Sequence, residues 1–509
     1  MVRLTDVVAV SAEVGATRSR LAKVAAIAGA LRLAEDADEA KAVVAFLSGA
    51  IQQGRIGAGW RTLVELPAPA PEPTLAVADV DAAFDRLVDT RGAGSVGRRA
   101  EIIAGLFGAA TAAEQRFLRA LITGELRQGA LEGVMLDAVA KAADVPGEAV
   151  RRAFMLSGRL PETAALALAG GVDALTAVRL EPGRPVRPML ASPGTSVAAA
   201  IADLSPCLVE YKLDGARIQV HKVDDEIRVF TRTLREITDS VPELVELVRG
   251  LPCHTVVLDG ETLALSDDGR PRPFQETQSR FGSTTEEQVR ALLLRPYFFD
   301  CLHLDGVDLI DQPLRARNEA LNRAVGPHVI PGAIDPTPEE AEAVGAAALA
   351  AGHEGVMVKD LDSAYQAGRR GKAWQKVKPV HTLDLVVIGA EWGHGRRSGF
   401  LSNLHLGARD PDGGPPIMVG KTFKGLTDEL LRWQTTEFPK YQRDRDDWAV
   451  YLRPELVVEI ALDGVQASTR YPGGVALRFA RVVRYRPDKQ AADADTITDV
   501  RGLLPVAQG

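Results

Sequence analysis

The 509-residue sequence has few cysteines and no long apolar run. Cys207, Cys253 and Cys301 are far apart and form no C-x-x-C pair, which argues against a four-cysteine zinc site and a disulfide framework. No stretch approaches the roughly 18 consecutive apolar residues of a membrane span, and the apolar run at residues 7–10 is interrupted at Glu13. We therefore expect no transmembrane helix, no signal peptide and no membrane partner, and we expect a cytoplasmic location.

An excess of positive charge is also absent. Lys plus Arg number 60 and Asp plus Glu 68, so the net charge is -8. Bulk charge therefore gives no indication of nucleic acid binding, although single domains can still present basic faces to phosphate. The hydrophobic content of 46% and charged content of 25% are typical of soluble globular proteins. The length predicts roughly three domains.

The pattern of residues changes twice along the chain. Residues 1–182 carry apolar residues at helical spacing and predict an all-α domain, interrupted by the proline-rich segment 66–73. Residues 183–380 alternate like antiparallel strands, with helical stretches between them, and predict an α+β domain. Residues 381–509 contain short strand-like runs and one helical piece, 427–438, which is typical of a β-barrel of OB type.

A lysine at the end of a predicted strand is the first candidate for chemistry. In EYKLDGAR (210–217), Glu210, Lys212 and Asp214 share one face, because side chains alternate along a strand. Taken alone, such a lysine is usually a solvated charge. However, Glu261 and Glu354 also occur within apolar strand-like runs, where carboxylates are costly to bury without cations or hydrogen bonds.

Two further lysines supply matching positive charge. Lys376 and Lys378 in WQKVKP lie two residues apart and therefore on one face of a strand. Such a pair repels unless an anion lies between its members, and phosphate is the natural anion. Each element alone fits an exposed strand, but the whole set in one domain favours a phosphate-binding site.

Seven motifs occur in a fixed order: KLDGAR (212–217), TRTLREIT (231–238), LDGE (258–261), FFDCLHLDG (298–306), EGVMVK (354–359), WQKVKP (374–379) and RFARVVRYRPDK (478–489). This series resembles the nucleotidyltransferase motifs of ATP-dependent DNA ligases. The resemblance covers nearly the whole chain. Residues 383–400 resemble the start of the ligase OB domain, and residues 114–136 resemble the helical DNA-binding domain of the larger ligases.

The resemblance implies three nucleotidyl transfers. Lys212 attacks the α-phosphate of ATP and keeps AMP; AMP passes to the 5'-phosphate of a nick; the 3'-hydroxyl then displaces it. The implied catalytic residues are Lys212, Lys376, Lys378 and Asp214. The two later lysines and a divalent metal are expected to disfavour the ammonium form of Lys212, which would leave a nucleophilic amine.

The resemblance also implies the contacts of ATP and Mg²⁺. The implied ATP-binding residues are Glu210, Arg217, Arg232, Glu261, Phe299, Lys376, Lys378, Arg486, Asp488 and Lys489. Arg217 and Glu261 match positions that hold the ribose, Phe299 matches the aromatic that stacks on adenine, and Glu210 lies near the base edge. Arg232 matches a position that meets phosphate.

The resemblance also implies residues that place the metal and residues that orient the β- and γ-phosphates. Glu261 and Glu354 are the candidates for placing Mg²⁺, and the R-x-D-K residues of the last motif are implied to orient the β- and γ-phosphates. Lys359 lies five residues after Glu354, so regular alternation places it on the other strand face. A site role and a core or salt-bridge role are both open for it.

The implied partner is nicked duplex DNA, and we expect a monomer. Candidate DNA contacts are Ser95, Arg127, Arg396, Arg397, Lys421 and Lys424. The helical third contains no nucleotide motif. A chain that starts near Val186 is therefore expected to retain self-adenylylation and to lose most of its affinity for nicks.

Other functions carry related motifs. An RNA ligase or a capping guanylyltransferase also uses K-x-D-G, but the ligase-like helical third argues against both. The cysteines cannot form the four-cysteine zinc site of an NAD-dependent ligase. A non-catalytic DNA-binding scaffold could lose the lysine or the carboxylates, and both are present here. The sequence leaves open whether the enzyme serves repair or replication.

Overall fold

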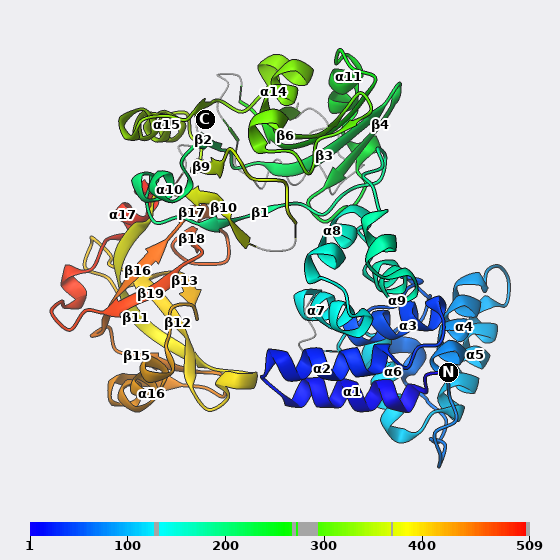
Figure 1. The fold of residues 1–509 in the computed structure, drawn as a ribbon. Helices are drawn as coiled ribbons and strands as arrows, with labels where there is room; N and C mark the ends of the chain where they lie inside the picture. The colour runs from blue at the N-terminus through cyan, green and yellow to red at the C-terminus, as the bar shows by residue number, and fades with distance from the viewer. Residues whose placement is uncertain (127–131, 267–270, 273–293, 368–369, 505–509) are drawn as a thin grey trace.

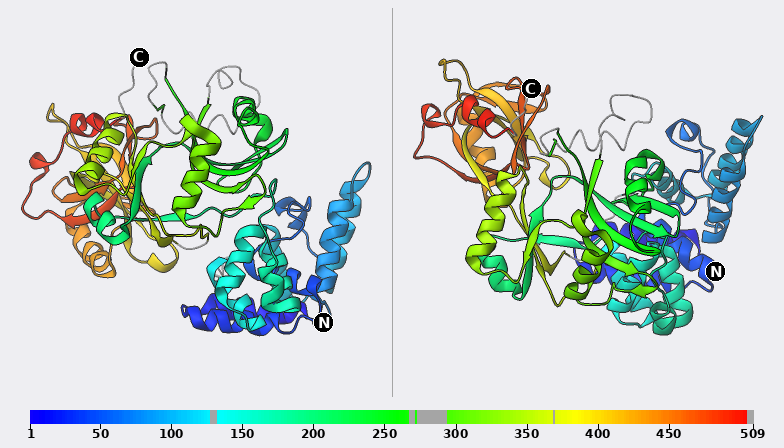
Figure 2. Two further views of the ribbon diagram at one scale, coloured as in Figure 1. Left: turned by 45° about the horizontal axis from the view of Figure 1, so that its top comes forward. Right: turned by 90° about the horizontal axis from the view of Figure 1, so that it is seen from above.

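The computed structural model describes residues 1–126, 132–266, 271–272, 294–367 and 370–504, without the side chains of Arg370 and Arg396. A helical region, a central region with two sheets and a strand-rich C-terminal region follow one another along the chain (Figure 1). The central region joins the other two, which lie on either side of it (Figure 2).

Local sequence signals explain the helices of the first region. α6 follows Thr111, whose side chain caps the helix together with Glu114. The helix buries Phe117, Leu118 and Leu121 against the other helices. The helical elements are α1 (Leu4–Ala16), α2 (Arg20–Leu31), α3 (Ala37–Ser48), η1 (Trp60–Leu63), α4 (Val77–Asp89), α5 (Ser95–Ala109), α6 (Ala112–Ile122), α7 (Glu132–Ala143), α8 (Gly147–Ser157) and α9 (Leu160–Thr176).

The proline-rich segment 66–73 forms no helix, as its composition predicts. It lies in an extended conformation against α5 and α6. Ala70 N donates to Ala110 O at 2.9 Å, and Gln115 Nε2 donates to Pro67 O at 3.1 Å. These bonds satisfy backbone groups that no helix or sheet would pair.

Two sheets form the centre of the molecule. The first has the order β4-β3-β5-β6-β7 and is antiparallel throughout; the second has the order β1-β10-β9-β2-β8 and is antiparallel except for the parallel β1–β10 pair. The strands are β1 (Leu190–Pro193), β2 (Cys207–Lys212), β3 (Ala216–Val223), β4 (Glu226–Thr231), β5 (Thr255–Ala264), β6 (Leu294–Leu304), β7 (Val307–Asp308), β8 (Gly332–Ile334), β9 (Gly355–Asp360) and β10 (Arg370–Val377).

The predicted strands of this region are confirmed, including the tight turn at Asp224, which has a φ of 50°. Helices cover the outer faces of the two sheets: α10 (Val197–Leu204) and α15 (Pro338–Ala350) pack on the second, and α11 (Pro242–Arg249) and α14 (Leu314–Val325) on the first. Short 3₁₀ turns occur at η2 (Thr238–Ser240) and η3 (Gly326–His328).

The C-terminal region is strand-rich, as predicted. Its main sheet has the order β13-β12-β11-β15-β14, and β16 pairs with both β11 and β19. The strands are β11 (His381–Trp392), β12 (Leu401–Ala408), β13 (Ile417–Thr422), β14 (Gln442–Arg445), β15 (Ala449–Leu452), β16 (Val457–Leu462), β17 (Gly464–Ala467), β18 (Val475–Arg478) and β19 (Arg481–Tyr485). Among the described residues, the strand pairings alone do not close a barrel.

The predicted helical piece is α16 (Asp428–Glu437), capped by Thr427. A second helix, α17 (Ile497–Gly502), was not predicted, because its six residues are too short to show a helical period. Three 3₁₀ turns complete the region: η4 (Gly395–Arg397), η5 (Phe438–Tyr441) and η6 (Ala491–Asp493). In the described parts of the chain, none of the helices has both the length and the apolar character needed to cross a membrane.

Candidate active site

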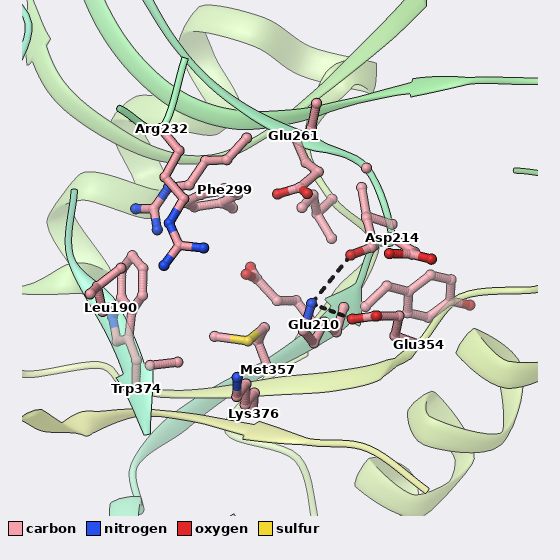
Figure 3. A pocket seen from close by; sticks show the side chains of 18 of the residues that line it. Leu190, Glu210, Asp214, Arg232, Glu261, Phe299, Glu354, Met357, Trp374 and Lys376 are labelled. Atoms are coloured by element: carbon pink, nitrogen blue, oxygen red, sulfur yellow. Dashed lines mark hydrogen bonds and ion pairs between the residues drawn. The ribbon is translucent and has the colours of Figure 1, made fainter. Parts of the chain in front are cut away.

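A cavity of about 720 Å³ opens between the two central sheets, a size typical of ligand sites. Figure 3 shows side chains from both sheets pointing into it. The predicted residues that line it are Glu210, Lys212, Asp214, Arg217, Arg232, Glu261, Phe299, Glu354, Lys376 and Lys378. The structure therefore brings together residues that span more than 160 positions of the sequence.

Lys212 is the last residue of β2, and its ammonium group is tightly paired. Its Nζ lies 2.6 Å from Glu354 Oε2, and Lys378 Nζ lies 2.6 Å from the same oxygen. Burial acts to raise the pKa of Glu354, but the two lysines outweigh it and lower the pKa to about 2. Lys212 therefore lies beside a carboxylate as well as beside the expected cation Lys378.

Glu354 reaches this position because it lies just before β9. Its N–H donates to Lys212 O at 3.0 Å. Gly355 has a φ of 137°, and a Cβ there would meet Val377 O at 2.3 Å. This backbone conformation interrupts the alternation, so Glu354 and Lys359 both line the cavity. The prediction that they face opposite ways is wrong for this reason.

Lys359 occupies the floor of the cavity beside Glu210. The two side chains are 1% and 4% exposed, and Lys359 Nζ lies 2.5 Å from Glu210 Oε1. Burial raises the pKa of Glu210 despite this ion pair. Lys359 Nζ also lies 4.5 Å from the ring centroid of Phe299 and 4.4 Å from that of Trp374. Sequence analysis missed Trp374 as a wall residue, although it belongs to WQKVKP.

Arg217 is held by acceptors from three segments. Its Nε and Nη2 donate to the two carboxylate oxygens of Asp259 at 3.0 and 2.6 Å, and its Nη1 donates to Met189 O at 2.7 Å. Tyr365 donates its hydroxyl proton to Asp259 Oδ2 at 2.6 Å. Most of the guanidinium donors are thus already used within the protein, and the plane lies 5.3 Å from the Phe299 centroid.

Two residues from the C-terminal region also line the cavity, Arg478 and Phe479. Arg478 Nη1 donates to Asp214 Oδ2 at 3.2 Å, and its Nη2 lies 3.9 Å from Glu354 Oε1. Burial and the charge of Glu354 raise the pKa of Asp214, and Arg478 opposes them. Both residues belong to the start of the motif at 478–489, for which only the R-x-D-K end was predicted to have a role.

The end of that motif lies elsewhere. Arg486, Asp488 and Lys489 do not line the cavity. Arg486 Nη1 and Lys489 Nζ contact Asp384 Oδ2 at 2.9 and 2.6 Å, and hydrogen bonds to Arg486 lower the pKa of Asp488 to about 2. The predicted contact of these residues with the β- and γ-phosphates therefore requires an arrangement of the regions other than this one.

Of the predicted DNA contacts, Arg127 lies outside the described residues, as does the side chain of Arg396. Ser95 begins α5 after Gly94, which has a φ of 73°. The preceding loop is closed by Arg98, which donates to Ala93 O and Arg91 O at 2.9 and 2.8 Å.

The remaining candidates lie on the C-terminal region. Lys421 forms an ion pair with Glu391, and this pairing weakens the attraction of Lys421 for a DNA phosphate. Arg397 donates to Phe423 O at 2.6 Å, and Lys424 Nζ lies 5.0 Å from the ring centroid of Phe479.

Glu261 provides a testable pH dependence. Burial raises its pKa to about 8, against a usual value of 4.5. Between these pH values the folded chain binds one more proton than the unfolded chain, so Glu261 makes the protein less stable as pH rises through this window. Glu261→Gln keeps the approximate size and the neutral charge of the protonated side chain, and it removes the titration. We expect its melting temperature, relative to the parent protein, to increase from pH 5 to pH 8 and then level off.

Thermal melts in metal-free buffer measure this difference. Asp488→Asn is the matched control, because the pKa of Asp488 is about 2, its carboxylate does not titrate in the window, and it lies outside the cavity that contains Glu261. A melting-temperature difference for Glu261→Gln that is constant from pH 5 to pH 9 would contradict the assignment.

A strand-end lysine among cations and carboxylates, in a cavity between two largely antiparallel sheets, defines the central region as a nucleotidyltransferase domain. Family comparisons make this more specific. Models described as "ATP dependent DNA ligase domain", "ATP dependent DNA ligase C terminal region" and "DNA ligase N terminus" match residues 188–378, 397–489 and 61–140. The chain belongs to the ATP-dependent DNA ligase family.

Curated relatives extend over the whole chain. A "Probable DNA ligase" of Rhodococcus opacus (strain B4) is 67% identical over 98% of this chain and 99% of its own length. One of Saccharopolyspora erythraea is 65% identical over 100% of both chains. The solved structure "Pmar-Lig_Pre." covers 94% of this chain and 99% of its own, with 18% identity and a TM-score of 0.61, and so shares the fold. The chain is an ATP-dependent DNA ligase.

Proposed function

We propose that the cavity binds ATP and that Lys212 carries AMP between ATP and the 5'-phosphate of a DNA nick. The observation that supports this most strongly is the convergence of a strand-end lysine, the cations Lys376 and Lys378, and the aromatic wall of Phe299 and Trp374 in one cavity. ATP carries an aromatic base and a polyphosphate chain, so its site needs an aromatic wall beside a group of cations.

Lys212 attacks as the neutral amine. Its lone pair forms the P–N bond to the α-phosphorus while the P–O bond to pyrophosphate breaks, and pyrophosphate leaves with the bonding electrons. The low pKa of Glu354 makes this carboxylate a poor proton acceptor. We therefore assign Glu354 to holding Lys212 Nζ in place, and the proton departs to phosphate oxygen or water. Lys378 offsets charge that develops on the transferred phosphoryl group.

The two later steps use the same cavity. The 5'-phosphate oxygen of the nick attacks the lysyl-AMP phosphorus and releases the amine of Lys212. The 3'-hydroxyl then attacks the 5'-phosphorus and AMP leaves. Arg478 lies between Asp214 and Glu354 in this arrangement, so we assign it to orienting the carboxylates during these steps.

We propose Mg²⁺ as the metal, held by Glu261 and Glu354. Among the described residues there is no group of three or more His, Cys, Asp or Glu side chains that could hold a metal alone. Two carboxylates facing a polyphosphate site nevertheless fit Mg²⁺, which commonly takes one or two carboxylates together with phosphates and water. When bound, the ion would neutralise negative charge on the phosphates.

We further propose three domains, 1–182, 183–380 and 381–509, that act as a monomer on duplex DNA in the cytoplasm. The close approach of Gly420 on β13 to Leu477 on β18 supports an OB-type barrel for the third. The candidate DNA contacts Ser95, Arg127, Arg396, Arg397, Lys421 and Lys424 come from two of these domains. Contacts of this kind give affinity for DNA that depends on salt and not on sequence.

The test is to incubate the full chain with Mg²⁺ and α-labelled ATP, GTP or NAD, and to measure acid-labile label bound to the protein. We expect labelling by ATP alone, chased to nicked DNA. Labelling by GTP would indicate a capping-type enzyme, transfer only to RNA ends an RNA ligase, and no label with any nucleotide a DNA-binding scaffold.

A further inference from the structure

The helical region contributes to the apolar cluster behind the ATP cavity. Met155 and Leu156, near the end of α8, are 3% and 0% exposed and belong to a buried cluster that also contains Phe299, Tyr365 and Trp374. Phe299 and Trp374 line the cavity itself. One layer of apolar side chains therefore separates α8 from the proposed adenine site.

Backbone hydrogen bonds fix Met155 to the central region. Arg187 N donates to Met155 O at 2.9 Å, and Ala367 N contacts Met155 Sδ at 3.2 Å. Ala367 lies two residues after Tyr365, in the segment that links β9 to β10. Met155 thus contacts the segment that carries one of the cluster's aromatic rings.

Tyr365 connects this segment to Arg217. Its hydroxyl donates to Asp259 Oδ2 at 2.6 Å and accepts from Met189 N at 3.0 Å. Asp259 in turn holds Arg217 through two hydrogen bonds. The path from α8 to a cavity-lining guanidinium therefore passes through one buried tyrosine and one buried aspartate.

The residue that caps α8 lies close to a second segment beside the cavity. A Cβ on Gly158, at the end of α8, would lie 3.5 Å from Leu234 Cδ1. Leu234 belongs to the turn after β4, whose neighbours Arg232 and Arg235 line the cavity. The end of α8 is therefore in van der Waals reach of this turn.

A surface ion pair fastens the same helix. Arg152 Nε and Nη2 donate to the two carboxylate oxygens of Asp311 at 3.1 and 2.6 Å, and hydrogen bonds to Asp311 raise the pKa of Arg152. The side chains are 29% and 55% exposed, so the pair adds modestly to the apolar packing.

We propose that α8 is a positioning element of the ATP site, so that adenylylation of Lys212 depends on the helical region even without DNA. Met155 and Leu156 hold Tyr365 and Trp374 in place, and through them Arg217. This inference rests on the assignment of the cavity as the ATP site. It replaces the expectation that a chain starting near Val186 adenylylates normally, because such a chain lacks α8 and exposes the cluster.

The test uses the full chain carrying Met155→Ala, with single-turnover self-adenylylation measured at 20 °C over a range of ATP concentrations. Loss of the thioether loosens Tyr365 and Trp374, so the ATP concentration for half-maximal rate should rise about fivefold, within the usual range for coupled sites. The rate at saturating ATP should change by less than about twofold, because Lys212 and its partners are untouched.

Leu118→Ala is the matched control. Leu118 is fully buried in the core of the helical region. It does not belong to the cluster of Met155, Leu156, Phe299, Tyr365 and Trp374 behind the cavity. It should lower the melting temperature and leave the half-saturating ATP concentration unchanged. If Met155→Ala does not fold, Arg152→Ala and Asp311→Ala should each raise this concentration, with no further increase in the double variant.

The inference would be overturned if Met155→Ala, or both Arg152→Ala and Asp311→Ala, reached half-maximal rate at the same ATP concentration as the parent protein. So would an equal increase in Leu118→Ala. Labelling of Lys212→Ala would instead overturn the assignment of the ATP site, so the two failures are distinguishable.

Discussion

Replacement of Lys212 by alanine should abolish AMP attachment and reduce nick sealing by at least about three orders of magnitude, as expected when a covalent nucleophile is lost. Among the described residues, Lys378 is the other lysine that contacts Glu354. It follows the end of β10, and its Nζ is also 3.9 Å from Asp463. The measurement is transfer of α-label from ATP to the protein, followed by sealing of a nicked duplex.

Lys372→Ala is the control for this result, since Lys372 is an exposed lysine on β10, the strand that carries Lys376. It should label and seal like the parent protein. The Lys212→Ala variant should fold normally, because its side chain is 21% exposed and Glu354 retains Lys378 as a partner. If the Lys212→Ala protein still became labelled, another residue would have to be the nucleophile.

Replacements of Arg478 and of Lys489 should impair different chemical steps. Pyrophosphate is present only in the first step, so groups that orient the β- and γ-phosphates act only there. Lys489→Ala or Asp488→Ala should therefore lower self-adenylylation about 100-fold and leave sealing of a pre-adenylylated nick within about threefold. Arg478 lies in the cavity while Lys489 lies outside it, so Arg478→Ala should mainly slow sealing of the pre-adenylylated nick.

Single-turnover assays of the two reactions, with circular dichroism to verify folding, compare these variants. Lys378→Ala is the reference for loss of both reactions, because Lys378 faces the cavity in this arrangement and contacts Glu354. Equal loss of both reactions in the Lys489 and Asp488 variants would show that the C-terminal region does not change position between steps.

Sequence analysis located the strands of the central region and the position of Lys212 at the end of β2, because alternation and turn residues are local properties of the chain. It also identified ten residues that line one cavity; nine of them lie in six of the seven ordered motifs, and Glu210 lies two residues before the first motif. It did not find α17, which is too short for a helical period, or the parallel β1–β10 pair, which joins segments 180 residues apart.

The residue types and their order therefore determined the family, and they predicted the nucleophile and most of the residues that line the cavity. Tertiary structure alone decided which charges meet. The pairing of Lys212 with Glu354 depends on how β9 approaches β2, and the entry of Arg478 depends on the position of the C-terminal region. Likewise, α8 reaches the cavity-backing cluster only because the helical region docks there. Coulomb and packing energies depend on the distance between side chains in space. Neither the hydrophobic period of a segment nor the spacing of motifs along the chain specifies that distance.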